Sequence, residues 1–247
     1  MSVYCVYLKY ARSADYLRAN YGRWLLTFES RQSADGFYRA MKVVKNTANN
    51  LRYVTFHRST PQLWCYDTTD GEPWWTIKLI LEGDTTWNYS VMTTLLNDTN
   101  GTRDWPVVNN IVEGSDWFNG GSFFVRNKLI PDLYWHPDGS AIIATKERRT
   151  KFVVRGTAFK KTDDEQVLLR SDKITIEVAE STSTDKILFV GHGHDNAILV
   201  ITADKYKWTF KDFFELFGVK WYTESGKDTE KQFLIYSPAI SDEWELV

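Results

Sequence analysis

The chain has 247 residues, of which 43% are hydrophobic and 25% are charged, a composition typical of a globular protein with a sizeable core. Aromatic residues make up 15% of the chain, which excludes a disordered protein, because disordered segments are poor in aromatic side chains. The 30 basic and 32 acidic residues give a net charge of -2. A protein that follows nucleic-acid phosphates normally carries a basic excess, so we expect no nucleic-acid partner.

The N-terminal sequence MSVYCVYLK has no basic segment followed by a long apolar core, and no apolar run in the chain is long enough to cross a bilayer. We therefore expect a cytoplasmic protein with no membrane partner. The two cysteines, Cys5 and Cys65, lie in apolar, strand-like runs and are expected to be buried thiols. A single disulfide between them stays open as an alternative.

Short runs rich in β-branched and aromatic residues, separated by polar turns, predict strands along the whole chain. In chain order they are residues 3–8, 51–56, 75–80, 123–126, 151–155, 173–178, 186–190 and 197–201. Asp-Gly and Asn-Gly dipeptides predict tight turns at residues 35–36, 70–71, 100–101 and 138–139. Helical spacing of apolar residues is confined to 11–19 and 211–217. This pattern predicts an all-β protein.

One arrangement recurs along the chain: a first strand, a spacer with a polar turn, and a closing strand that ends on an aromatic residue. It fits residues 3–44, 51–81, 122–156 and 173–210, and residues 231–247 resemble a shortened copy. With one further unit assumed near residues 87–117, spacings of about 30–50 residues predict a repeat architecture. The large aromatic residues at the unit ends are expected to be core residues; they are Trp75, Phe152, Trp208 and Trp244.

The stretches 122–156 and 173–210, together with the ending DEWELV at 242–247, resemble β-trefoil proteins of the fungal ricin-B-like lectin and trefoil protease-inhibitor type. The Gln-x-Trp signature of those lectins is absent. The resemblance is closer over 122–247 than over 1–121. It implies two tandem trefoil lobes, a β-trefoil-like N-terminal lobe over 1–118 and a C-terminal lobe over 122–247. The glycine-containing stretch 109–121 is the expected boundary.

The segment YWHPDG at 134–139 places aromatic rings beside a carboxylate. Sugar recognition uses this pair of chemistries, because a ring packs on the CH face of a pyranose while a carboxylate or amide pairs with its hydroxyls. An alternative interpretation is a Pro-Asp-Gly turn with Tyr and Trp in the core. The expected ligand-binding residues are Tyr134, Trp135, His136, Asp138, Asp195, Asn196, Trp64 and Asp67.

The segment GHGHDN at 191–196 carries two histidines, His192 and His194, that would share one face of a strand and could bind one metal ion. A stable site needs further ligands, and the chain has 4 histidines in all, so we interpret the segment as a hairpin turn. We expect no metal and no cofactor. The basic run KERRTK at 146–151 is expected to be a solvated loop.

The resemblance implies a non-catalytic carbohydrate-binding protein, a lectin whose partners are glycans or glycoproteins, with a homodimer left open. A trefoil-type protease inhibitor that uses an exposed loop, such as 156–172 or 223–230, is one alternative. An enzyme with an aromatic-rich pocket, such as a glycoside hydrolase or a cyclase, is another, and a cytoskeletal cross-linker built from tandem trefoils is a third.

Overall fold

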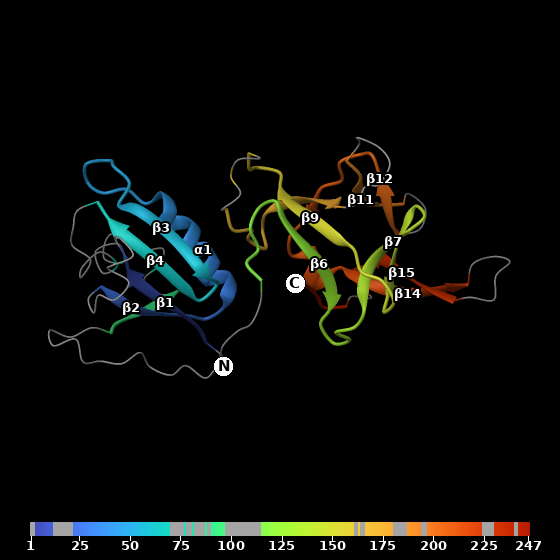
Figure 1. Cartoon of the computed structure of the whole chain (residues 1–247), viewed down its shortest axis with the longest axis horizontal. Coiled ribbons are helices and arrows are strands. Elements are labelled where there is room, and N and C mark those ends of the chain that lie inside the picture. The colour runs from blue at the N-terminus through green and yellow to red at the C-terminus, as the bar shows by residue number, and fades with distance from the viewer. Residues whose placement is uncertain are drawn as a thin grey trace. The chain divides into compact units, whose positions relative to one another are not determined.

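The computed structural model describes residues 3–11, 22–69, 77, 81, 87, 90–96, 115–160, 163, 166–179, 187–193, 197–223, 230–239 and 242–247. The chain divides into two compact units, Met1–Asp116 and Trp117–Val247 (Figure 1). The division falls inside the stretch 109–121, where we expected the boundary. Strands form most of the secondary structure, so the all-β class is confirmed, with one long helix as the main exception.

The N-terminal unit contains a five-stranded sheet with the strand order β3-β4-β1-β2-β5. Its strands are β1 (Tyr4–Tyr10), β2 (Arg23–Phe28), β3 (Tyr53–Thr60), β4 (Leu63–Thr68) and β5 (Val91–Leu95). Strands β1 and β4 run parallel, and the other neighbours run antiparallel. Helix α1 (Arg31–Val43) contacts β1, β2 and β3, and it lies across the sheet in Figure 1.

Helix α1 corrects two of our predictions, because residues 35–36 are not a tight turn and residues 37–44 are not a closing strand. The Ser30 side chain accepts a hydrogen bond from the Ser33 backbone N–H at 3.2 Å, which caps the first turn. The apolar residues then recur at helical spacing on one buried face; they are Ala34, Phe37, Tyr38 and Met41. A short apolar run read alone fits a strand equally well. Neither α1 nor the parallel β1–β4 pair was part of the β-trefoil-like lobe that we expected over 1–118.

The same sheet decides between the two alternatives for the cysteines. Cys5 and Cys65 are both free and buried, as expected for apolar thiols. Lys9 is the residue of β1 that pairs with Cys65 of β4. Cys5 is four positions from Lys9, or about 13 Å at the rise of an extended strand. A disulfide cannot span that separation.

The C-terminal unit is built around a closed barrel of seven strands, β6 to β12, in which β12 pairs with β8 as well as with β11. The barrel strands are β6 (Gly121–Asn127), β7 (Tyr134–Asp138), β8 (Ala141–Thr145), β9 (Lys151–Gly156), β10 (Lys173–Val178), β11 (Phe189–His192) and β12 (Leu199–Thr202). The remaining elements are β13 (Trp208–Thr209), α3 (Asp212–Glu215), β14 (Phe217–Thr223), β15 (Glu230–Tyr236) and β16 (Trp244–Leu246).

Two local predictions hold in this unit. Asp138 pairs with Ala141, so the β7–β8 hairpin turns over two residues, and Gly139 takes a φ of 61° that favours glycine. Helix α3 lies within the segment 211–217, where helical spacing was noted, and it buries Phe213. The other helical candidate, 11–19, and the turn dipeptides at 70–71 and 100–101 lie outside the described residues.

Large aromatic side chains fill the core of the C-terminal unit. Phe152, Trp208 and Trp244 are at most 2% exposed, which confirms the expectation that residues at unit ends pack inside; Trp75 lies outside the described residues. The indole N–H of Trp208 donates to the Val190 carbonyl at 2.8 Å, and that of Trp244 to the Phe217 carbonyl at 2.9 Å. The two buried indoles are therefore satisfied as well as packed. Among the described helices, none has the length and apolar character needed to span a membrane.

Candidate functional site

Two of the predicted ligand-binding rings are inaccessible. Trp135 and Trp64 are both 0% exposed. Trp135 points into the barrel, where the centroid of its ring lies 5.2 Å from that of Phe217 and 5.7 Å from that of Trp244. Our expectation that Trp135 and Trp64 stack on a ligand is therefore corrected, because adjacent residues of a strand face opposite sides and these two face the core.

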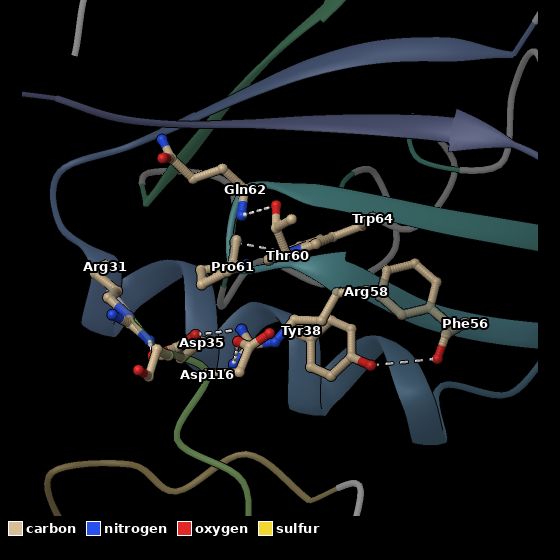
Figure 2. A network of polar contacts seen from close by, with 11 residues as sticks. Arg31, Asp35, Tyr38, Phe56, Arg58, Thr60, Pro61, Gln62, Trp64 and Asp116 are labelled. Atoms are coloured by element: carbon tan, nitrogen blue, oxygen red, sulfur yellow. Dashed lines mark hydrogen bonds and ion pairs between the residues drawn. The ribbon is translucent and has the colours of Figure 1, made fainter. Parts of the chain in front are cut away.

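Figure 2 shows the surroundings of Trp64 in the N-terminal unit. Its indole N–H donates to the Pro61 carbonyl at 3.0 Å, and its ring packs 5.1 Å from that of Tyr38. The neighbouring candidate, Asp67, is half-buried, and its carboxylate accepts a hydrogen bond from the Thr68 backbone N–H at 2.9 Å. Both residues serve the local structure of β4.

A buried network of charged side chains lies near Trp64 and Tyr38 (Figure 2). The Arg58 side chain, 0% exposed, lies 2.6 Å from a carboxylate oxygen of Asp35 and 2.6 Å from one of Asp116. Arg31 donates to the Ser115 carbonyl at 2.7 Å, which fastens residues 115–116 to helix α1. Burial raises the pKa of Asp116, although the two arginines oppose that shift. Each charge has a partner, so the network is structural.

Three other candidates lie along the outer face of β7 at alternating positions. Tyr134 contacts the ring of Phe124 edge-on at 6.3 Å, and His136 Nδ1 lies 2.8 Å from the Thr150 hydroxyl. Asp138, at the end of the strand, accepts a hydrogen bond from Lys231 Nζ at 2.6 Å. These contacts place Asp138 near strand β15 and leave Tyr134 and His136 on the barrel surface.

The candidates Asp195 and Asn196, and the histidine His194, lie outside the described residues. The ring of His192 stacks on that of Tyr236 at 5.9 Å with an interplanar angle of 10°. Over the residues that the structure describes, no three His, Cys, Asp or Glu side chains gather closely enough to hold a metal ion.

A surface groove of about 540 Å³ lies between β8, the loop after it, and the β14–β15 hairpin. Its walls are formed by Leu133, Ile143, Ala144, Thr145, Lys146, Glu147, Trp221, Lys231 and Gln232. Trp221 is 57% exposed, unlike the buried core tryptophans. The groove thus offers a tryptophan ring that is accessible, in contrast to the buried Trp135 of β7.

Strand pairing explains how these residues come together. Phe233 of β15 pairs with Ile143 of β8, which brings the two strands into one sheet. On β14, Trp221 stands directly opposite Gln232 of β15, so the indole and the amide share one side of the hairpin. Figure 1 shows β14 and β15 extending together from the barrel.

Two ion pairs hold the lysines of the groove. Lys146 Nζ lies 2.9 Å from a carboxylate oxygen of Asp132, and this hydrogen bond lowers the pKa of Asp132. Lys231 Nζ is held by Asp138, a predicted site residue that is linked to the groove through this ion pair. The Thr145 hydroxyl accepts a hydrogen bond from the Glu147 backbone N–H at 3.2 Å and fixes the start of the loop. The groove therefore combines one exposed indole with carboxylate, amide and hydroxyl groups.

The sequence interpretation missed Trp221, Gln232 and Glu147. The signal that could have found Trp221 is its place near the polar end of a strand, before the charged stretch 224–231. A core tryptophan would normally be expected mid-strand between apolar neighbours. No sequence signal predicts that Trp221 and Glu147 line the same groove, because this depends on the pairing of β15 with β8.

No protein-family model and no curated protein matches the chain. One solved structure, described as "Crystal structure of HCR/D-Sa-GBL1/C", aligns with 54% of this chain and 44% of its own, at 12% sequence identity and a TM-score of 0.35. The chain thus spans less than half the length of that protein.

Proposed function

We propose that residues 117–247 form a β-trefoil domain that binds carbohydrate without catalysis, with the groove beside Trp221 as its binding site. The observation that carries the binding proposal is the 57% exposed indole of Trp221 on a groove wall that also holds Glu147 and Gln232. An exposed ring beside hydrogen-bonding side chains is the arrangement that pyranose recognition requires.

The trefoil part of the proposal is supported by a pairing pattern that recurs along the unit. The first strand of each of two successive segments pairs with the fourth, β6 with β9 and β10 with β13. The strands between them form hairpins, β7–β8 and β11–β12. Strand β16 returns to pair with β6, as the last strand of a closed repeat must. The two fourth strands carry the buried aromatic residues Phe152 and Trp208, and the returning strand β16 carries the buried Trp244.

The groove suits a neutral sugar. Its two lysines are each paired with an aspartate, so they add little net positive charge. The Trp221 face would pack on the CH groups of a pyranose ring, while the Glu147 carboxylate and the Gln232 amide would pair with hydroxyls. Binding of this kind involves no covalent step, and the groove volume of about 540 Å³ accommodates a mono- or disaccharide.

The test is a glycan array with fluorescently labelled full-length protein, followed by calorimetric titration of the sugar that binds best. We expect a family of related glycans that free sugar competes away, and Trp221→Ala should weaken binding by tenfold or more, as for loss of roughly 1.5 kcal/mol of ring contact. Ile187→Ala is the matched control, since it truncates an exposed apolar side chain of the same unit outside the groove.

An array without hits from folded protein would contradict the proposal. Binding that survives Trp221→Ala unchanged would remove the groove as its site, even if the domain binds sugar elsewhere.

A further inference from the structure

The basic run 146–151 contains one residue that is fixed to the barrel. Thr150 is 5% exposed; its backbone N–H donates to the Trp135 carbonyl at 3.3 Å, and its hydroxyl lies 2.8 Å from His136 Nδ1. Arg149 and Lys151 flank Thr150 in the chain, and both are exposed.

The two cations converge on one aromatic ring. The Arg149 guanidinium carbon lies 4.6 Å from the centroid of the Phe124 ring, and Lys151 Nζ lies 5.3 Å from it. Arg149 also lies 5.9 Å from the ring of Tyr134. Cross-strand pairing of Phe124 with Lys151 places Lys151 beside this ring, so both positive charges lie next to one aromatic side chain.

Neither cation has a carboxylate partner among the residues that the structure describes. Their neighbours differ: Arg126 pairs with Glu245 at 2.7 Å, and Lys128 pairs with Glu243 at 2.6 Å. The carboxylates of Glu243 and Glu245 are thus already engaged. Glu147 is the one acidic residue of the loop, and it faces the groove. Two like charges near one ring repel each other, and an anion placed between them relieves the repulsion.

We propose that Arg149 and Lys151, with the exposed Arg148 beside them, form a binding site for a sulfated polysaccharide. Sulfate groups are ionised at every physiological pH and accept the paired N–H groups of a guanidinium. The patch is small and the chain carries a net charge of -2, which disfavours a long nucleic-acid track. The Phe124 ring already contacts both cations, which limits its use as a platform for base stacking. This site does not depend on the Trp221 groove.

The test measures binding of the full-length protein to immobilised heparin by surface plasmon resonance. We expect binding that weakens as salt rises from 50 to about 300 mM, because such contacts are screened. The double variant Arg149→Ala, Lys151→Ala should bind roughly tenfold to a hundredfold more weakly, as for the loss of two charged hydrogen-bonding groups. The exchanged variant Arg149→Lys, Lys151→Arg keeps both charges and should retain most of the binding.

The matched control is the double variant Lys205→Ala, Lys207→Ala. It removes two positive charges from exposed positions of the same unit. Lys205 resembles the proposed site residues because its Nζ lies over an aromatic ring, 5.7 Å from the centroid of Phe189. It should leave heparin binding within about twofold, and so should Trp221→Ala. Thermal unfolding of each variant verifies the fold.

Three outcomes would overturn the proposal: no heparin binding at 50 mM salt, equal loss in the Lys205, Lys207 control, or equal binding of chemically desulfated heparin. Tighter binding of polyphosphate or of a single-stranded oligonucleotide than of heparin would also overturn it, since the ligand would then be a phosphate polymer. An absence of hits on the glycan array would not contradict this proposal, because the array tests the groove beside Trp221.

Discussion

The two units of this chain differ in where their charged side chains lie. The N-terminal unit buries a guanidinium, Arg58, between two carboxylates beneath a helix. The C-terminal unit fills its interior with aromatic and aliphatic side chains and keeps its ion pairs at the surface, as with Arg126 and Glu245, each about one-third exposed. A helix packed on one face of an open sheet leaves room for a polar contact at its margin, whereas the interior of a closed barrel is filled by side chains. The same kind of substitution should therefore cost very different amounts in the two units.

The largest effect should come from the barrel core. Trp244→Ala removes a fully buried ring that contacts Trp135 at 5.7 Å, and should destabilise the C-terminal unit by about 3–5 kcal/mol. Urea unfolding followed by circular dichroism measures the change. Trp221→Ala, the exposed counterpart in the same unit, should stay within about 0.5 kcal/mol of the parent. Equal losses would mean that Trp221 is also a core residue.

A slightly smaller loss is expected when the buried charge network is broken. Arg58→Ala leaves Asp35 buried without its nearest partner and should cost about 3 kcal/mol. We take the low end of the usual range because the Asp116 side chain keeps 16% exposure and can be hydrated. Hydrogen exchange measured over residues 31–43 should accelerate.

The surface counterpart of that variant sharpens the comparison. Arg155→Ala removes the partner of Glu177, with 30% of the arginine side chain exposed, and should cost about 0–1 kcal/mol. If Arg155→Ala lowers the free energy of unfolding as much as Arg58→Ala does, burial does not explain the difference between the two ion pairs.

A moderate effect is expected at the β6–β7 loop. The Asn127 side chain, in a residue 2% exposed, accepts hydrogen bonds from the backbone N–H groups of Leu129 and Ile130 at 3.0 and 2.9 Å. Asn127→Ala should lower the free energy of unfolding by about 1–2 kcal/mol, since both donors lose their acceptor. Asn127→Asp preserves the acceptor oxygen and should restore most of that loss in the same urea titration.

The smallest effect is a pH dependence at Asp116. Its folded-state pKa is raised above the ordinary 3.8 by burial, so its contribution to stability is fully present at lower pH and is lost as the pH rises through the raised value. Asp116→Asn removes this titration. The free energy of unfolding of the parent, relative to that of the variant, should therefore fall as the pH rises above 3.8. Urea titrations from pH 3 to 7 measure this change. A difference that is constant across this range would show that Asp116 titrates normally.

Part of this architecture could be predicted locally. The β7–β8 turn follows from Asp138-Gly139, and the burial of Phe152, Trp208 and Trp244 follows from large rings at the ends of apolar strands. Helix α1 could not be predicted, because its apolar run also fits a strand and the deciding cap, Ser30, precedes that run.

The candidate site was harder to predict than the strands. Trp135 and Trp221 are both tryptophans in strands with polar neighbours, and composition does not say which side of the strand faces the core. Trp135 points inward because β7 is a barrel strand packed against Trp244, while Trp221 lies on a hairpin that extends from the barrel. A shift of one position in register exchanges the two faces of a strand, so exposure is a property of the pairing.

The sequence by itself determined the strand-rich class, the burial of the two thiols and the aromatic filling of the core, because each depends on the side chain and its immediate neighbours. Tertiary structure alone decided three further features: the parallel β1–β4 pair, the meeting of β8 with β15 that forms the groove, and the convergence of Arg149 and Lys151 on Phe124. These depend on contacts between residues distant in the chain, which local propensity does not encode.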